Sequence, residues 1–169
     1  MNTPASVNFG WTVASGLVGA LLALVLKHLY DRWQSHKTRR RRAGALRAEI
    51  NYCARLARTY LTEGYTAPLY RFPNAVFDSM YPHLLSDALT EMDIEALTGF
   101  FSLVDQMNRG LDAVERYRAA KDQDHAEEEI RRLMAKAEQM AHPTDASRIP
   151  GENLRYYAGA IAAVDRHAQ

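Results

Sequence analysis

The feature that most constrains this chain is a long apolar stretch close to its N-terminus. Residues 9–26 read FGWTVASGLVGALLALVL, without a charged side chain or a proline. Val7, Leu29 and Tyr30 lengthen the stretch to the roughly 20 residues that a helix needs to cross a hydrocarbon core of about 30 Å. Aromatic side chains flank it, as is typical at membrane interfaces: Trp11, Tyr30 and Trp33. The sequence therefore predicts a single transmembrane helix; the alternative is a buried core helix of a soluble protein.

The charges on the two sides of this stretch predict its orientation. Residues 1–26 carry no charged side chain, whereas residues 27–47 carry eight basic side chains and one acidic, a net charge of +7. Residues 48–169 carry the balance, a net charge of −6. Because positively charged flanks stay in the cytoplasm, we expect the N-terminus outside the inner (cell) membrane and the C-terminal domain inside. The sequence KHLYDRW after the stretch is a poor cleavage site, which predicts an uncleaved signal anchor.

Small residues recur every fourth position along the apolar stretch. One row is Ser15, Gly19 and Ala23, and the row beside it is Thr12, Gly16 and Ala20. Small side chains at this spacing let two transmembrane helices approach closely, which predicts a homo-oligomer. The alternative is that glycine and alanine are simply common in such helices.

The basic side chains after the apolar stretch are predicted to contact lipid headgroups. They are Lys27, Arg32, Lys37, Arg39, Arg40, Arg41 and Arg42. Each cation close to an anionic surface contributes about 1 kcal/mol. A nucleic-acid patch is the alternative, because basic runs bind phosphate without sequence preference. The position directly after a membrane span favours lipid.

Helical periodicity continues through the rest of the chain, and no segment alternates like a strand. We expect one helix from residue 9 to about 61, with an apolar stripe from Leu46 to Tyr60, and a short helix over residues 74–80 that ends before Pro82. A further helix is expected from Thr90 to about Ala120, opened by a capping box of Thr90 with Asp93 and carrying an apolar stripe from Ile94 to Val114. Two more helices are expected, one ending at His142-Pro143 and one after Pro150-Gly151. The fold class is all-α, with a single transmembrane helix continuing into a small cytoplasmic bundle of four to five helices. The expected segments are an anchor (1–30), a basic juxtamembrane helix (31–45) and the bundle (46–169).

Aromatic residues gather in and after the loop that ends the long helix. They are Tyr65, Tyr70, Phe72, Phe77 and Tyr81, together with Tyr60. A partner or ligand surface is one interpretation, because loops on a scaffold often carry function. The favoured interpretation is that the rings close one end of the bundle. Asn108 is a second open case, either a buried polar residue that fixes helix register or a residue facing water.

The sequence contains no motif for phosphate binding, dinucleotide binding, zinc hydrolysis or serine catalysis. The single cysteine, Cys53, excludes an internal disulfide and lies on an apolar stripe, which predicts a small buried side chain. His125 precedes Glu128 and Glu129 at helical spacing, but a solvated charge cluster is favoured over a metal site. We expect no catalytic residue, no cofactor and no metal.

Three hypotheses of function follow. The leading one is a membrane-anchored, non-enzymatic helical adaptor that self-associates and recruits an unknown cytoplasmic protein. The second is a membrane-perturbing effector of a bacterial defence or toxin system, disfavoured because the apolar stretch has no polar stripe to line a conducting path. The third is a membrane-tethered nucleic-acid binder using the arginine run 39–42, disfavoured by the acidic balance of the bundle.

Overall fold

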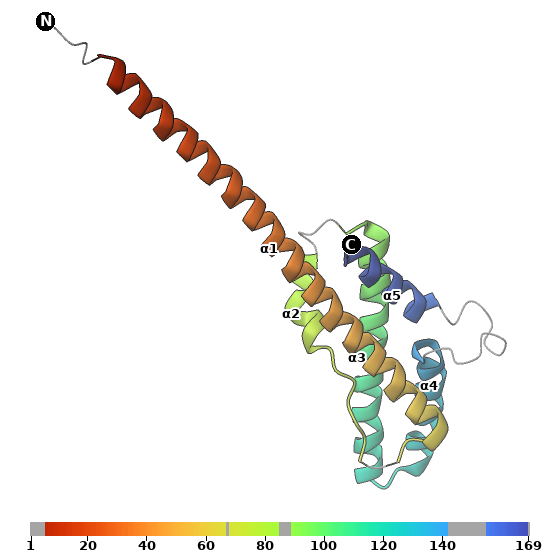
Figure 1. Ribbon diagram of the computed structural model, residues 1–169. Coiled ribbons are helices and arrows are strands. Elements are labelled where there is room, and N and C mark those ends of the chain that lie inside the picture. The colour runs from red at the N-terminus through yellow and green to blue at the C-terminus, as the bar shows by residue number, and fades with distance from the viewer. Residues whose placement is uncertain (1–5, 67, 85–88, 142–154, 169) are drawn as a thin grey trace, which may run out of the picture. The chain divides into compact units, whose positions relative to one another are not determined.

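The computed structural model describes residues 6–66, 68–84, 89–141 and 155–168, without the side chains of residues 6–18, 84 and 155. These residues form five helices and no strand, which confirms the all-α class (Figure 1). The helices are α1 (Ser6–Glu63), α2 (Ala75–Leu84), α3 (Glu91–Ala119), α4 (Gln123–Met140) and α5 (Arg155–His167). The chain divides into two compact units, residues 1–39 and residues 40–169.

Within the described residues, no helix combines the length and the apolar character that crossing a bilayer requires. This finding gives the predicted transmembrane helix and signal anchor no support. Residues 9–18 of the predicted stretch, with Ser15 and Gly16 among them, lie outside the residues whose side chains the structure describes.

The second half of α1 lines the core of the second unit. Its buried side chains, each at most 4% exposed, recur at steps of three and four: Ala43, Leu46, Ile50, Cys53, Ala57 and Tyr60. This is the spacing that places apolar residues on one side of a helix. Side chains of α2, α3, α4 and α5 complete the same hydrophobic core. The stripe that the sequence showed from Leu46 to Tyr60 is therefore the core face of α1.

The α3 and α4 helices of the second unit pack side by side and are joined by a tight turn (Figure 1). The α3 helix begins at the predicted capping box, in which the Thr90 hydroxyl accepts from the Asp93 amide and the Asp93 carboxylate accepts from the Thr90 amide. The turn contains Lys121 in the left-handed region, at φ 59°. Asp122 then caps α4 by accepting a hydrogen bond from the His125 amide. The α5 helix packs mainly on α3.

The α2 helix runs past the point where the sequence placed its end. We expected residues 74–80 to be helical with an end before Pro82, but α2 continues to Leu84 with Pro82 inside it. Proline removes one backbone donor and disfavours helix in the residue before it. Here Phe77 and Met80 hold the helix against the core, and this tertiary packing outweighs the local signal.

Candidate functional site

Large apolar side chains lie exposed on α1 before the helix enters the second unit. We call this set the α1 apolar surface. Its members are each 53–64% exposed: Leu21, Leu22, Leu24, Val25, Leu26, Leu29, Tyr30 and Trp33. Isolated exposed apolar residues are common on proteins, but a contiguous apolar patch marks a contact site for membrane or protein.

The predicted headgroup-contacting cations begin within this surface, at Lys27 and Arg32, and continue beyond it to Arg42. Lys27, Arg32, Lys37, Arg40 and Arg41 are exposed, and Arg39 and Arg42 are half-buried. Among the described residues only Arg40 makes a hydrogen bond, donating from Nε to the carbonyl of Ala168 at 3.3 Å. The Lys37 ammonium lies 5.0 Å from the centre of the Trp33 ring. The remaining cations are not engaged by the described part of the fold.

The small residues predicted for self-association are described only from Gly19 onward. Gly19, Ala20 and Ala23 are exposed. A Cβ added at Gly19 would meet no atom within 4 Å. A larger side chain at this position therefore has no steric effect inside one copy of the chain.

The predicted aromatic surface divides into buried and exposed rings. Tyr65, Phe72 and Phe77 are buried in the core, whereas Tyr70 and Tyr81 are exposed. The Tyr65 ring stacks on Tyr60 with centroids 4.5 Å apart, and Phe77 stacks on Phe101 at 4.1 Å. A docking surface built on these rings has only Tyr70 and Tyr81 to offer.

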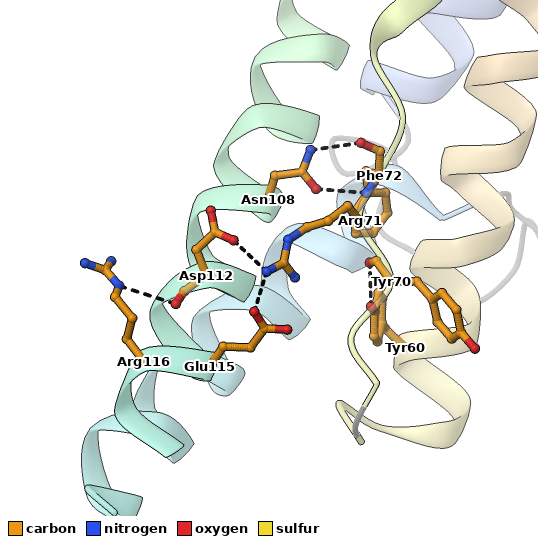
Figure 2. A network of polar contacts seen from close by, with 8 residues as sticks. All are labelled: Tyr60, Tyr70, Arg71, Phe72, Asn108, Asp112, Glu115 and Arg116. Atoms are coloured by element: carbon orange, nitrogen blue, oxygen red, sulfur yellow. Dashed lines mark hydrogen bonds and ion pairs between the residues drawn. The ribbon is translucent and has the colours of Figure 1, made fainter. Parts of the chain in front are cut away.

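Asn108 on α3 holds the backbone of the segment that connects α1 to α2. Its side-chain carbonyl accepts from the Phe72 amide at 2.8 Å, and its amide nitrogen donates to the Phe72 carbonyl at 2.9 Å (Figure 2). Asn108 thus satisfies both backbone groups of one buried residue. Both expectations for Asn108 were therefore wrong. It neither fixes helix register nor faces water, because its partner is a loop residue 36 positions away.

Two further contacts fix the same connecting segment. The Arg71 guanidinium pairs with Asp112 and Glu115 on α3, each at 2.6 Å, and the Tyr60 hydroxyl donates to the Tyr70 carbonyl at 2.6 Å (Figure 2). Arg71 is thus paired with two carboxylates of α3, and Arg116 donates to the backbone carbonyl of Asp112. The arrangement holds the loop against α3.

Glu49 is a buried carboxylate that the sequence did not single out. Its two oxygens accept from the amides of Val76 and Phe77, at 3.0 and 2.9 Å, at the N-terminal end of α2. A carboxylate at a helix N-terminus is favourable because it satisfies free amides and meets the positive end of the helix dipole. The one sequence signal for this cap is that Glu49, an acidic residue, stands directly beside the apolar stripe of α1.

Cys53 lies one turn further along α1 and is buried, as predicted. Its thiol donates to the Pro73 carbonyl at 3.3 Å. Burial, followed by the nearby Glu49 carboxylate, raises the pKa of Cys53 from 9.0 to about 12. The thiol therefore stays protonated and unreactive at neutral pH.

The sequence also did not reveal an ion pair between the buried Asp93 of α3 and the half-exposed Arg166 of α5. Asp93 is 2% exposed and pairs through one carboxylate oxygen with Nε of Arg166 at 2.8 Å and with Nη2 of the same residue. Burial by itself would raise the pKa of Asp93, but hydrogen bonds from Arg166 and Thr90 hold it below its usual value. The pair fixes α5 to the start of α3.

His125 takes part in the cap of α4. Its Nδ1 lies 2.8 Å from a carboxylate oxygen of Asp122, and its ring stacks on Tyr117. Glu128 pairs instead with Arg132 at 2.5 Å. The described residues contain no group of three or more histidine, cysteine or acidic side chains that could hold a metal ion.

The described side chains thus offer two kinds of surface. One is the α1 apolar surface with its neighbouring cations, and the other is the exposed part of the second unit, including Tyr70 and Tyr81. No protein family, curated protein or solved structure matches the chain.

Proposed function

We propose that this chain is a membrane-anchored, non-enzymatic helical module that self-associates through its N-terminal helix and recruits a cytoplasmic protein. The observation that carries the proposal is the α1 apolar surface, on which each side chain is more than half exposed. Full burial of one such side chain is worth about 1.5–3 kcal/mol. Leaving the whole set in water is therefore strongly unfavourable, and an apolar solvent is the simplest environment for it.

The distribution of the apolar residues around α1 favours lipid over a protein partner. Residues 19–26 read GALLALVL, so more than two turns of helix carry no polar side chain on any side. A helix that is apolar all round is either buried in a large core or surrounded by lipid. Residues 9–18 carry no charge either, and their polar side chains are the small Thr12 and Ser15.

The cations that follow support an orientation with the second unit in the cytoplasm. Lys27 and Arg32 come after the charge-free residues 19–26, and no charged side chain precedes those residues. Basic residues at one end of a span are retained on the cytoplasmic side and contact anionic headgroups there. Tyr30 and Trp33 have the amphipathic rings that interfaces accommodate.

The second unit supports a binding role for the proposed cytoplasmic part. Its buried polar side chains Glu49 and Asp93 are engaged in helix capping and in an ion pair, which are structural tasks. Its exposed tyrosines are of a residue type that is frequent at protein interfaces. The partner is a protein of unknown identity, and no cofactor is proposed.

The anchor is tested by extraction of the full chain from native membranes. We expect the wild-type chain to stay in the pellet after an alkaline carbonate wash, and a Leu22→Arg, Val25→Arg double variant to enter the supernatant. The matched control is Met92→Arg, which places a charge at an exposed apolar residue of the second unit and should leave extraction unchanged. Release of the wild-type chain by carbonate would contradict the anchor.

Orientation and self-association have separate readouts. In sealed spheroplasts an external protease should leave the second unit intact, and digestion there would reverse the orientation. For self-association, Gly19→Leu should shift detergent-solubilised protein from dimer or larger species toward monomer. Leu21→Phe adds bulk on another side of α1 and should leave the oligomer unchanged, whereas a monomeric wild type would refute self-association.

A further inference from the structure

Beyond Leu26 the surface of α1 changes from apolar all round to two-sided. Side chains on one side recur at steps of three and four and include the rings: Leu26, Leu29, Tyr30, Trp33 and Lys37. The other side carries polar groups: His28, Asp31, Arg32, Ser35 and Arg39. At 3.6 residues per turn these two sets lie on opposite sides of the helix. We call the first set the ring face.

The ring face combines apolar area with a cation held close to it. Leu29, Tyr30 and Trp33 are each more than half exposed, and the two rings lie 6.3 Å apart. The Lys37 ammonium lies 5.0 Å from the Trp33 ring centre, within the range of a cation–π contact. Indole and phenol rings with an adjacent ammonium are suited to a headgroup layer, which offers both acyl chain and phosphate.

Charge indicates that lipid, and not a second copy of the chain, covers the ring face. Residues 27–39 contain four basic side chains and one acidic. Lys37 is the cation on the ring face, and a pair of α1 helices packed along this face would bring two Lys37 ammonium groups together, which is unfavourable. An anionic membrane surface attracts the same cations.

The spacing along α1 sets a geometric condition on this contact. Lys37 lies eleven positions beyond Leu26, or about 16 Å along the axis at 1.5 Å per residue. The headgroup layer on each side of a bilayer is only about 5–8 Å thick. A helix normal to the membrane would therefore place Lys37 beyond the headgroups, whereas a tilt toward the ring face brings this side down, and tilts of up to about 40° occur.

We propose that α1 leaves the membrane tilted toward its ring face, with Leu29, Tyr30 and Trp33 in the interface and Lys37 on an anionic phospholipid headgroup. This proposal rests on the membrane anchor described above and adds to it a lipid class and a direction. It separates the cations by side: Lys37 binds the membrane, and Arg32 faces away although it lies five positions closer to Leu26, the last residue of the charge-free stretch. Proximity alone predicts the opposite ranking.

The test uses Trp33 as a depth probe in the full chain. The Trp11→Phe variant leaves Trp33 as the single tryptophan, and the chain is reconstituted in vesicles of phosphatidylcholine alone or with phosphatidylglycerol. Quenching by lipids brominated near the headgroup should increase when phosphatidylglycerol is present. Lys37→Gln should remove about half of that increase or more, and Arg32→Gln should leave most of it.

The outcomes separate this proposal from the anchor on which it rests. Carbonate extraction of the same vesicles reports the anchor, and release of the chain would overturn both. Retention of the chain with equal quenching in the two lipid mixtures would overturn only the anionic contact. A larger loss with Arg32→Gln than with Lys37→Gln would overturn the tilt toward the ring face.

Discussion

Between Leu21 and Trp33, α1 exposes more than half of each large apolar side chain, whereas between Ala43 and Tyr60 it buries its apolar side chains almost completely. Both segments belong to one helix, so helix propensity does not separate them. They differ in where polar residues stand. The later segment alternates an apolar stripe with residues such as Arg47 and Arg55, whereas residues 19–26 have no polar side at all.

This difference teaches which surface the chain can cover by itself. A striped helix buries its apolar side against neighbours and keeps its polar side in water. The second unit supplies those neighbours from α2 to α5. Residues 19–26 have no polar side to present to water, so burial of one side would still leave the rest exposed. This pattern is the basis of our proposal that lipid surrounds these residues.

The largest expected difference between the two regions is in the stability of the second unit. Leu111 is fully buried, and Leu111→Ala should lower the free energy of unfolding by about 2–5 kcal/mol, because it leaves a cavity. Leu24→Ala removes the same atoms from an exposed site and should change that free energy by less than about 0.5 kcal/mol. Urea unfolding of the full chain in mild detergent, followed by circular dichroism, measures both. Equal effects would show that the two regions are not distinct in packing.

Two glycines sharpen the comparison with changes of opposite sign. A Cβ at Gly110 in α3 would lie 2.4 Å from Cδ2 of Leu133 and 3.1 Å from its Cγ, whereas a Cβ at Gly44 in α1 meets nothing within 4 Å. Gly110→Ala should therefore destabilise the second unit by about 1–2 kcal/mol through overpacking. Gly44→Ala should stabilise it by about 0.5–1 kcal/mol, since alanine is the better helix former. Thermal unfolding of both variants checks the two signs, and stabilisation by Gly110→Ala would contradict the packing of α3 on α4.

The smallest expected effect is the pH dependence that Asp93 gives to the second unit. Its pKa is lowered in the folded state, so its contribution is present above the unfolded pKa of about 3.9 and is lost as pH falls through the folded pKa. Because Arg166 is half exposed, solvent screens the pair and its contribution at neutral pH is small. Asp93→Asn should lose this contribution at pH 7 and flatten the acid limb of the stability curve. Unfolding series at pH 7 and in acid measure the slope, and an unchanged slope would assign it to other carboxylates.

Local signals predicted the helices, and long-range partners account for what the sequence did not reveal. The Thr90–Asp93 capping box and the stripes on α1 and α3 are encoded within a few positions of each other. The Asp93–Arg166 pair joins residues 73 positions apart, so no local pattern indicates it. The same holds for Asn108 on Phe72. The predicted end of α2 before Pro82 was wrong, because the buried side chains of Phe77 and Met80 hold the helix in place despite the proline.

The candidate surfaces were predicted unevenly for a similar reason. The α1 apolar surface and its cations follow from the order of residues along the chain, because neighbouring positions of one helix carry them. The burial of the aromatic residues could not be predicted in this way. Tyr65 and Tyr70 are the same residue type in one loop, but Tyr65 faces the core and Tyr70 faces solvent.

The most direct test of the membrane anchor measures whether lipid covers α1 on every side. Cys53 is the only cysteine, is buried, and its pKa is raised to about 12, so it gives little background to a membrane-impermeant maleimide. Single cysteines at the four consecutive positions Leu21, Leu22, Ala23 and Leu24 sample all sides of the helix, and Met92→Cys is the exposed control on the second unit. In native inverted vesicles we predict rapid labelling at position 92 and protection at all four α1 positions until the membrane is dissolved in SDS. Labelling of the four positions at the rate of position 92, or protection on one side only, would contradict the lipid anchor.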